Sequence, residues 1–506
     1  MAAGLCIRSL VRKGSEQRGA EWATEFGVVR RRALAKRSAI IRYFAFKSPF
    51  FMPLGASRLK KSVLVPGVLF VASICLISCS TTPKAKDPPS GLDTRVLASQ
   101  SVTAGSTFGS LTIVDAFNDT LPRVAGIGAG SLNAPGLMEM SANRATVIVF
   151  DAGNNNVDVV NTTTESISGS IALPGATTSM VIPTQSATLG FTAVPTASLS
   201  GILTPAGAVV EMNLASNSTI STIGVPGAQT VVSNPGGSQL LAFSDDSDSM
   251  AVLSPAIAVS PVDQGCDSGS LSTACFLVTG FSRPAYAIYS SDGSTAYVLN
   301  CGLQCGGTQP ASIAVVNTAT FAITNTIPVE GATWALLNGT TMYVAGTPPP
   351  LTPQSNTCSG GPTTAATRCG RLDIVDLTSL AVVNTQELYL PDGYHDRMDL
   401  SANGQLFIGS HTCTTVGDVN NPVGEVRGCL AIYNTGEGNV VIPPDNGDVT
   451  GLAGLTNRQV EYVAEGGNLR VYDTDLDTLL ENQDFIPTGT IPVVGLVIDV
   501  KEIDFF

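Results

Sequence analysis

The chain contains only two histidines, and both lie in one stretch of its C-terminal third. His395 is followed directly by Asp396, and His411 comes later in the same stretch. A histidine oriented by a carboxylate can act as a general base, and two histidines with Asp418 or Glu425 could hold a divalent cation. These residues show no fixed ligand spacing, and no G-x-S-x-G sequence is present. Two surface loop residues are therefore the alternative interpretation of the histidines.

A cysteine with a different chemistry ends an apolar segment near the N-terminus. Three basic residues within 58–61 precede the apolar run 62–77, and the sequence Leu-Ile-Ser-Cys ends at Cys79. A basic segment before an apolar core of about 16 residues fits a secretory signal better than a membrane-spanning helix of about 20. This ending resembles a bacterial lipobox, which implies that Cys79 is acylated and becomes the mature N-terminus. An uncleaved membrane anchor is the alternative.

The N-terminal part of the chain divides accordingly. Residues 1–51 are rich in arginine, and Met52 would begin a signal of ordinary length, so we interpret 1–51 as a doubtful extension from a mis-set start. An organellar presequence is the alternative. Residues 52–79 are the predicted signal peptide and lipobox, 80–93 a flexible Pro/Ser/Lys tether, and 94–506 the folded part.

The other cysteines predict disulfide bonds. Of eleven cysteines, eight fall into four close sequential pairs: Cys266/Cys275, Cys301/Cys305, Cys358/Cys369 and Cys413/Cys429. An even number in an exported chain is typical of disulfides, although eight cysteines allow about a hundred connectivities. A structural metal site would need C-x-x-C spacing, which only Cys301 and Cys305 approach.

Charge excludes one class of partner. Residues 1–61 carry 14 Lys and Arg against three acids, which leaves 13 basic and 37 acidic residues in the rest of the chain. Such an acidic surface repels nucleic acids and anionic lipid headgroups, and no basic patch with interleaved aromatic residues is present. We therefore expect no nucleic-acid binding.

The element that must position all of these residues is a repeated apolar strand that ends in Asp or Asn. It ends at Asp115, Asn161, Asn213, Asn317, Asp376, Asn434 and Asp473, and Ser249–Ser254 fills the longest gap in degraded form. From the second strand on, two further strand candidates around an Asx/Gly turn precede each one. Four-stranded antiparallel units at this period stack radially, so the sequence predicts an all-β propeller. Eight blades are expected, or seven if Ser249–Ser254 is an insertion.

The clearest unit supports this interpretation and suggests how the ring closes. Period-2 alternation predicts its strands at Ala285–Tyr289, Thr295–Asn300, Ser312–Val316 and Ala322–Val329. The first repeated strand has no obvious inner strand before it, whereas the C-terminal segment 491–500 has a strand with no unit of its own. Pairing these N- and C-terminal strands in one blade would close the ring.

Residues 290–331 resemble a known repeat. The sequence SSDGSTAYVLN, followed after a short loop by SIAVVNTATFAITNTIPV, looks like the YVTN-type repeat of bacterial and archaeal propellers. The resemblance is weaker around Asp376 and Asn434 and weakest before Asn213. It implies a propeller of the kind found in surface-layer and periplasmic proteins, in a fold shared with lactonase-like enzymes. Propellers host many unrelated activities, so the resemblance carries little about function.

Three successive units enlarge the loop between their second and third strands, at 301–310, 346–370 and 411–428, and each loop contains or adjoins a cysteine pair. These loops share one face of a propeller, and long ordered loops are usually functional. They predict a recognition face, with stability in a harsh compartment as the alternative. Trp334, expected on an inner strand, either lines the axial channel and stacks a ligand or fills the core. Asp245–Asp248 resembles a calcium-loop fragment but lacks the spacing, which favours a solvated turn.

These observations favour a non-enzymatic binding or scaffold module of the bacterial cell envelope. It would be lipid-anchored through Cys79, with the outer membrane favoured by Ser80, would face the periplasm or the cell surface, and would engage a protein or polysaccharide. The alternative is a lactonase-like hydrolase in which His395, Asp396 and His411 surround a divalent cation. Only fold analogy and the proximity of the histidines favour the hydrolase, and no cofactor is indicated otherwise.

Overall fold

The computed structural model describes most of the chain after its leader. The described residues are 88–101, 109–122, 126–199, 206–255, 264–266, 274–349, 369–413, 416–417, 426–427, 429–443, 447–474, 482–484 and 496–504. All of them belong to the compact unit Lys84–Phe506, whereas the unit Met1–Pro83, with Cys79, lies outside the described residues. Within the described part, no helix is long and apolar enough to cross a membrane.

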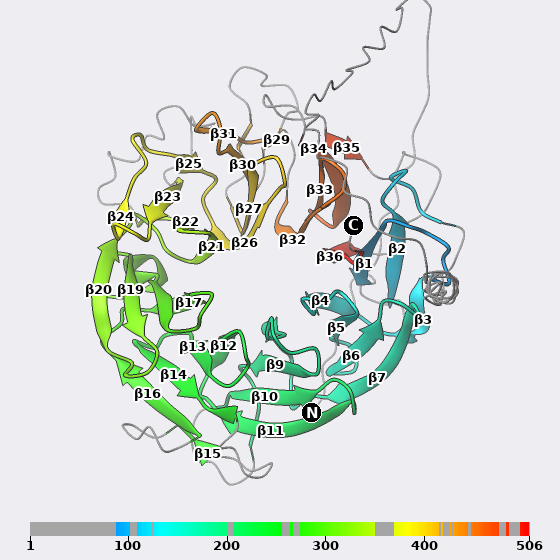
Figure 1. Ribbon diagram of the computed structural model, residues 1–506, viewed down its shortest axis with the longest axis horizontal. Coiled ribbons are helices and arrows are strands. Elements are labelled where there is room, and N and C mark those ends of the chain that lie inside the picture. The colour runs from blue at the N-terminus through cyan, green and yellow to red at the C-terminus, as the bar shows by residue number, and fades with distance from the viewer. Residues whose placement is uncertain are drawn as a thin grey trace, which may run out of the picture. The chain divides into compact units, whose positions relative to one another are not determined.

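Eight antiparallel sheets form a ring around a central axis (Figure 1). From the axis outwards, the first four blades contain these strands. Blade 1 has β36 (Leu496–Glu502), β1 (Arg95–Ser101), β2 (Gly109–Asp115) and β3 (Ile127–Leu132); blade 2 has β4 (Pro135–Met140), β5 (Thr146–Asp151), β6 (Asn156–Asn161) and β7 (Ser166–Ala172); blade 3 has β8 (Ser179–Val181), β9 (Leu189–Val194), β10 (Ala208–Asn213) and β11 (Ser218–Gly224); blade 4 has β12 (Ala228–Ser233), β13 (Leu240–Ser244), β14 (Ser249–Leu253) and β16 (Cys275–Thr279). A short strand, β15 (Gln264–Gly265), adds to the edge of β11 in parallel.

The second half of the ring repeats this arrangement. Blade 5 has β17 (Pro284–Tyr289), β18 (Thr295–Asn300), β19 (Ser312–Asn317) and β20 (Ile323–Pro328); blade 6 has β21 (Trp334–Asn338), β22 (Thr341–Gly346), β23 (Gly370–Asp376) and β24 (Ala381–Val382), with β25 (Tyr389–Leu390) also on β23; blade 7 has β26 (Tyr394–Leu400), β27 (Gln405–His411), β30 (Leu430–Asn434) and β31 (Asn439–Val441); blade 8 has β32 (Val449–Gly454), β33 (Val460–Glu465), β34 (Asn468–Asp473) and β35 (Asn482–Asp484). The chain segment that connects β27 with β30 contains a separate two-stranded ribbon, β28 (Val416–Gly417) and β29 (Val426–Arg427). The prediction of eight blades is confirmed, and Ser249–Ser254 supplies a blade strand.

The repeated Asp or Asn has the capping role that its position suggested. Asn161 Oδ1 accepts a hydrogen bond from the backbone N–H of Thr164 at 2.9 Å, and Asn317 Oδ1 accepts from Ala319 and Thr320 at 3.0 Å. The same side-chain cap occurs after Asp115, Asn213, Asp376 and Asn434. Each cap satisfies backbone donors at a turn where the ladder ends, which explains why the residue recurs.

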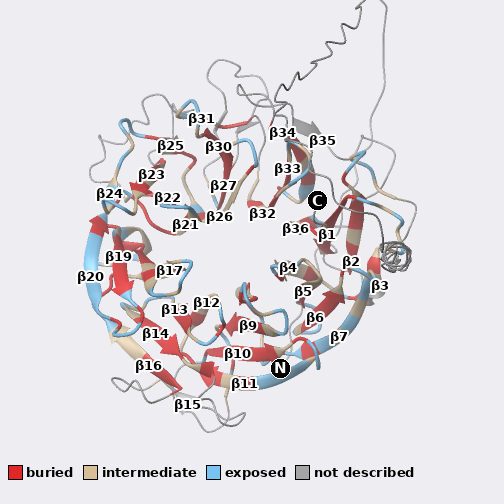
Figure 2. Ribbon diagram, in the orientation of Figure 1, coloured by how far each residue is buried: buried red, intermediate tan, exposed pale blue. Residues whose placement is uncertain are grey.

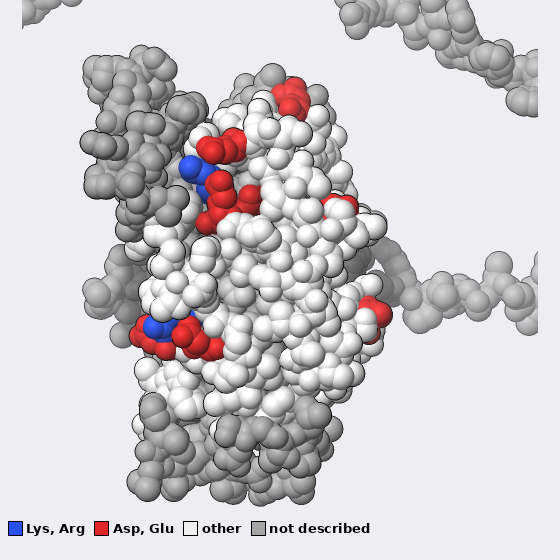
Figure 3. All heavy atoms as spheres, turned by 90° about the vertical axis from the view of Figure 1, so that its left-hand side faces the viewer, with Lys and Arg blue, Asp and Glu red and all other residues white. Residues whose placement is uncertain are grey.

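The core lies between the blades. Eight hydrophobic clusters fill the gaps between neighbouring sheets, and each combines side chains of two adjacent blades. Inner and middle strands are buried, whereas the outermost strands β7 and β20 are largely exposed (Figure 2). The outer face on the left-hand side of Figure 1 is mostly uncharged, and its basic groups lie beside acidic ones (Figure 3). Stacking of the blades therefore supplies the hydrophobic stabilisation that one sheet lacks.

The two ends of the folded part meet in blade 1. β36 is the innermost strand, and it pairs antiparallel with β1 in a register that joins Val96 to Glu502 and Ala98 to Val500. The predicted closure by an N- and a C-terminal strand is thus confirmed. The observed strand lies further along the chain than the predicted segment 491–500, whose residues 491–495 lie outside the described part.

Candidate functional site

The three enlarged loops leave equivalent ends of three successive blades. They connect β18 with β19, β22 with β23 and β27 with β30, which are the second and third strands of blades 5, 6 and 7. We call their described parts the loop patch: residues 301–310, 346–349, 369–370 and 411–413. The first of them contains the 3₁₀ turn η2 (Gly302–Cys305), while 350–368 and 418–425, with Asp418 and Glu425, lie outside the described residues.

Disulfides fasten these loops. Three predicted pairs are confirmed: Cys266–Cys275, Cys301–Cys305 and Cys413–Cys429. Cys369 is also disulfide-bonded, and its predicted partner, Cys358, lies outside the described residues. The pairs of the loop patch each close one loop, whereas Cys266–Cys275 closes the connection between β14 and β16.

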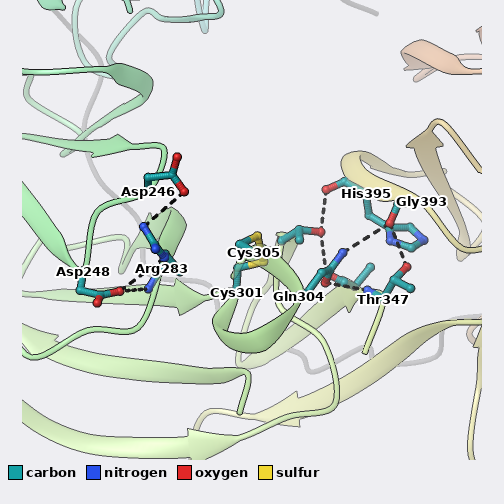
Figure 4. The surroundings of a disulfide bond; sticks show 11 residues. Asp246, Asp248, Arg283, Cys301, Gln304, Cys305, Thr347, Gly393 and His395 are labelled. Atoms are coloured by element: carbon teal, nitrogen blue, oxygen red, sulfur yellow. Dashed lines mark hydrogen bonds and ion pairs between the residues drawn. A yellow bond between two sulfur atoms is a disulfide. The ribbon is translucent and has the colours of Figure 1, made fainter. Parts of the chain in front are cut away.

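Gln304 joins the enlarged loops of blades 5 and 6 to the connection that enters blade 7 (Figure 4). Its Oε1 accepts a hydrogen bond from the Thr347 backbone N–H at 2.8 Å, and its Nε2 donates to the Gly393 carbonyl at 3.4 Å. Thr347 Oγ1 donates to the same carbonyl at 2.8 Å. Gly393 has a φ of 102°, and a Cβ there would lie 2.4 Å from the His411 carbonyl oxygen, so only glycine fits. The loop patch is therefore held as one surface.

A β-bulge in the inner strand of blade 7 separates the candidate catalytic residues. The register of β26 against β27 shifts between His395 and Arg397. Asp396 and Arg397 then both line the axial cavity, whereas His395 is 1% exposed and packs against Gly370 of the neighbouring blade. Burial lowers the pKa of His395 to about 4, so its ring is neutral at pH 7. The His395 side chain therefore lies between two blades, whereas the side chain of Asp396 lines the axial cavity.

The other histidine does meet Asp396. His411 Nε2 lies 2.9 Å from Asp396 Oδ2, and His411 Nδ1 faces Asp448 Oδ2 at 3.7 Å. The hydrogen bond that His411 donates to Asp396 outweighs burial and raises the pKa of His411, while Asp396 also pairs with Arg397 at 3.2 Å. The imidazole thus joins the end of β27 to Asp396 of β26, and its other nitrogen faces Asp448, which precedes β32.

The three predicted catalytic residues thus provide no joint constellation. Among the described residues, no group of three or more His, Cys, Asp or Glu side chains has the arrangement of a metal site. The Asp245–Asp248 turn joins β13 to β14, and its acids meet protein partners: Gln229 donates to Asp245 at 2.7 Å, and Arg283 lies 3.5 Å from Asp246 (Figure 4). Asp246 is 91% exposed at its side chain, as a solvated turn requires.

A cavity of about 650 Å³ lies on the ring axis, lined by the inner strands of the blades. Trp334 lines it, as one of the two interpretations expected, and its ring stacks on Tyr286 of blade 5 with centroids 3.9 Å apart. The wall also includes residues that sequence reasoning missed: Glu139, Tyr394, Arg397 and Lys501. They come from three different blades, with Tyr394 and Arg397 together on β26, so no local pattern could have identified the set. Cys305 belongs to the same wall, which makes the cavity continuous with the loop patch.

Comparisons with known proteins support the fold. No family model matches the chain, and no curated protein matches it. The structure of dihydro-heme d1 dehydrogenase NirN in complex with DHE is similar with a TM-score of 0.50 and 10% identity, over 81% of this chain and 75% of that one. Hydrazine synthase of Kuenenia stuttgartiensis has a TM-score of 0.39 and 14% identity over 67% and 77% of the two chains. The Cps50 (Swd1) β-propeller domain of Myceliophteria thermophila has a TM-score of 0.44 and 10% identity, over 67% of this chain and 96% of that one.

At 10% identity, the similarity to the NirN structure shows the fold alone. The chain is an eight-bladed β-propeller, a class in which each protein's site decides its function.

Proposed function

We propose that this chain is a non-enzymatic binding or scaffold module of the bacterial cell envelope, which engages a protein or polysaccharide through the loop patch. The observation that carries the proposal is the Gln304 junction, which joins the loops of blades 5 and 6 to the connection that enters blade 7, beside two disulfides. A surface ordered before binding loses less conformational entropy when a partner docks. A loop that only connects strands would need no such cross-links.

The cellular location of the protein is part of the same proposal. Acylation of Cys79 would hold the propeller at the envelope, with the outer membrane favoured, and two or three acyl chains would anchor it firmly. We also propose that the blades belong to the YVTN-type repeats that residues 290–331 resemble. The disulfides support an oxidising compartment such as the periplasm or the cell surface.

The hydrolase alternative has less support. It needs His395, Asp396 and His411 around one point, but His395 is buried between blades and His411 is already paired with Asp396. A general base must reach the proton that it removes, which the His395 ring cannot do from its buried position.

The test uses two matched positions. Leu303 in the loop patch is 41% exposed, and Ile220 on the outer strand β11 is 39% exposed. A photo-cross-linking amino acid is placed at each position of the full chain in cells that produce it. We expect an adduct of defined mass from position 303 and none from position 220, and weaker capture from position 303 when Gln304→Ala loosens the patch. Equal capture from both positions, or none from position 303, would overturn the proposal.

The anchor is tested separately. Cys79→Ser should release the protein from the membrane fraction into the soluble fraction, because it removes the acylated thiol, whereas Cys75→Ser should leave it bound. Retention of Cys79→Ser in the membrane fraction would contradict lipid anchoring and favour an uncleaved helix.

A further inference from the structure

The axial cavity has the size and the polar wall of a ligand site. Its volume of about 650 Å³ falls within the roughly 300–1,000 Å³ of small-molecule sites. Inner strands of separate blades contribute Glu139 (β4), Trp334 (β21), Arg397 (β26) and Lys501 (β36). A packed propeller axis needs none of these polar groups, since apolar residues would fill it at lower cost.

Glu139 supplies a carboxyl group of the cavity wall. None of the hydrogen bonds and ion pairs found in the described part of the chain involves its carboxyl group, although it faces the cavity. Burial raises the pKa of Glu139 to about 7, against the opposing field of Lys501. Glu139 is only partly buried, so its carboxyl oxygens can accept hydrogen bonds from a ligand that donates them.

The cations of the wall are already paired. Arg283 lies 3.5 Å from Asp246, Arg397 lies 3.2 Å from Asp396, and Lys501 Nζ lies 3.3 Å from Asp499 Oδ1. With Glu139 in addition, the wall has more negative than positive groups, which disfavours phosphate, sulfate and other anions. An added ammonium group would meet Lys501 and Arg397, whose charges already act on Glu139.

Hydroxyl groups fit this wall better than either kind of ion. Each hydroxyl both donates and accepts, so neighbouring hydroxyls can pair with carboxylates and with Arg or Lys at once. Trp334 adds a flat apolar surface, held in place by its stack on Tyr286. Alternating polar edges and an apolar face are the recognition features of a sugar ring.

We propose that the axial cavity binds a saccharide, with Glu139 and Arg397 on its hydroxyl groups and Trp334 against its ring. The inference rests on the proposed function: the end of a polysaccharide bound at the loop patch would enter the cavity, which is continuous with that patch. Glu139 acts as a binding residue, and no bond is made or broken.

The fluorescence of Trp334 reports on the cavity once Trp22, the other tryptophan of the chain, has been replaced. The full chain carrying Trp22→Phe is titrated with maltose, cellobiose and N,N′-diacetylchitobiose while its fluorescence is recorded. We expect a saturable change with at least one sugar. Glu139→Gln should weaken it about tenfold or more, as expected for a lost hydrogen bond to a charged group. Glu437→Gln, at the exposed turn before β31, should bind as the parent does.

Glu139→Gln should fold, since it removes a carboxylate that has no partner, and its thermal melt confirms this. No change with any of the three sugars, or an unchanged affinity of Glu139→Gln, would overturn the inference. A change with putrescine but not with the sugars would overturn it in favour of a cationic ligand. Failure here with capture from position 303 would reject the saccharide and leave the loop-patch function standing.

Discussion

At the junction of β36 with β1, the paired residues are about 400 positions apart in sequence, whereas the disulfides of the loop patch join cysteines 4 and 16 residues apart. We call the first region, with its contacts in blades 2 and 8, the closure seam. Closing so long a segment costs conformational entropy that grows with its length, and the strands must offset this cost by contacts alone. The two regions therefore show how one ring stabilises its distant and its local connections.

The closure seam uses buried ion pairs. Arg95 reaches Glu165 at 2.7 Å and Asp504 at 2.6 Å, and its Nη1 also donates to the Thr162 carbonyl. The side chains of Arg95 and Glu165 are only 6% and 3% exposed. Two further arginines bridge the same region, Arg144 to Glu502 and Arg458 to Asp119. Such charges are tolerated only when all partners are in place, so closure and ion pairing are cooperative.

The loop patch depends less on the rest of the ring. Its order comes from disulfides and from the hydrogen bonds of Gln304. The acids paired with Arg283, which lie in the turn between β13 and β14, are largely exposed. A disulfide acts mainly on the unfolded chain and needs no remote partner. We conclude that the seam determines whether the ring forms, while the disulfides act locally within the loop patch.

The largest expected effect is at the seam. Arg95→Met leaves Glu165 and Asp504 without their cation, which should lower the free energy of unfolding by about 3–5 kcal/mol in urea titration. Arg283→Met, in contact with exposed acids, should cost less than about 1 kcal/mol. Similar losses of stability in the two variants would show that the seam is no more sensitive than the exposed ion pairs of Arg283.

Loss of single disulfides should come next. In the chain-entropy estimate, Cys413→Ser/Cys429→Ser should cost about 3 kcal/mol and Cys301→Ser/Cys305→Ser about 2 kcal/mol, because the second pair closes a shorter loop. Both values come from urea titration without reductant. A larger loss for the shorter loop would mean that the disulfides act through native contacts and not through the unfolded chain.

The third prediction concerns how stability near the closure seam depends on pH. Burial, then Asp399 and Glu502, raises the pKa of Glu461 on the seam side well above its usual value. Stability should therefore fall as pH rises from about 4.5, where the unfolded group ionises, towards the raised value. Glu461→Gln should gain about 1–3 kcal/mol at pH 8 and nothing at pH 4, measured by thermal melts. A variant no more stable at pH 8 would show that the carboxyl group is solvated.

The smallest effect belongs to the His411 tie. Because Asp396 raises the pKa of His411, this contribution is complete below about pH 6.5 and is lost as pH rises through the raised value. His411→Ala should cost about 0.5–1 kcal/mol at pH 5.5 and almost nothing at pH 9. A loss that is equal at both pH values would point to packing instead of charge.

Much of the fold was open to prediction because its signals are local. The strands of blade 5 were placed within two residues of their observed ends, and the caps after Asn161 and Asn317 follow from Asx turn chemistry. The same holds for the confirmed disulfides, whose cysteines are close in sequence. The site was less accessible: the proximity of His395 and His411 in the sequence suggested a shared face, but His395 is buried against Gly370 while His411 pairs with Asp396.

The sequence by itself determined the repeat, the turns, the paired ends and the enlarged loops, because period-2 alternation and turn residues act within a few positions. Only the tertiary structure decided which single polar residues of distant repeats meet on the axis, as Glu139, Arg397 and Lys501 do. It also decided the partners of Arg95 at the closure seam. The physical reason is that ring closure brings side chains from all the inner strands to a common centre, and no local sequence pattern records that encounter.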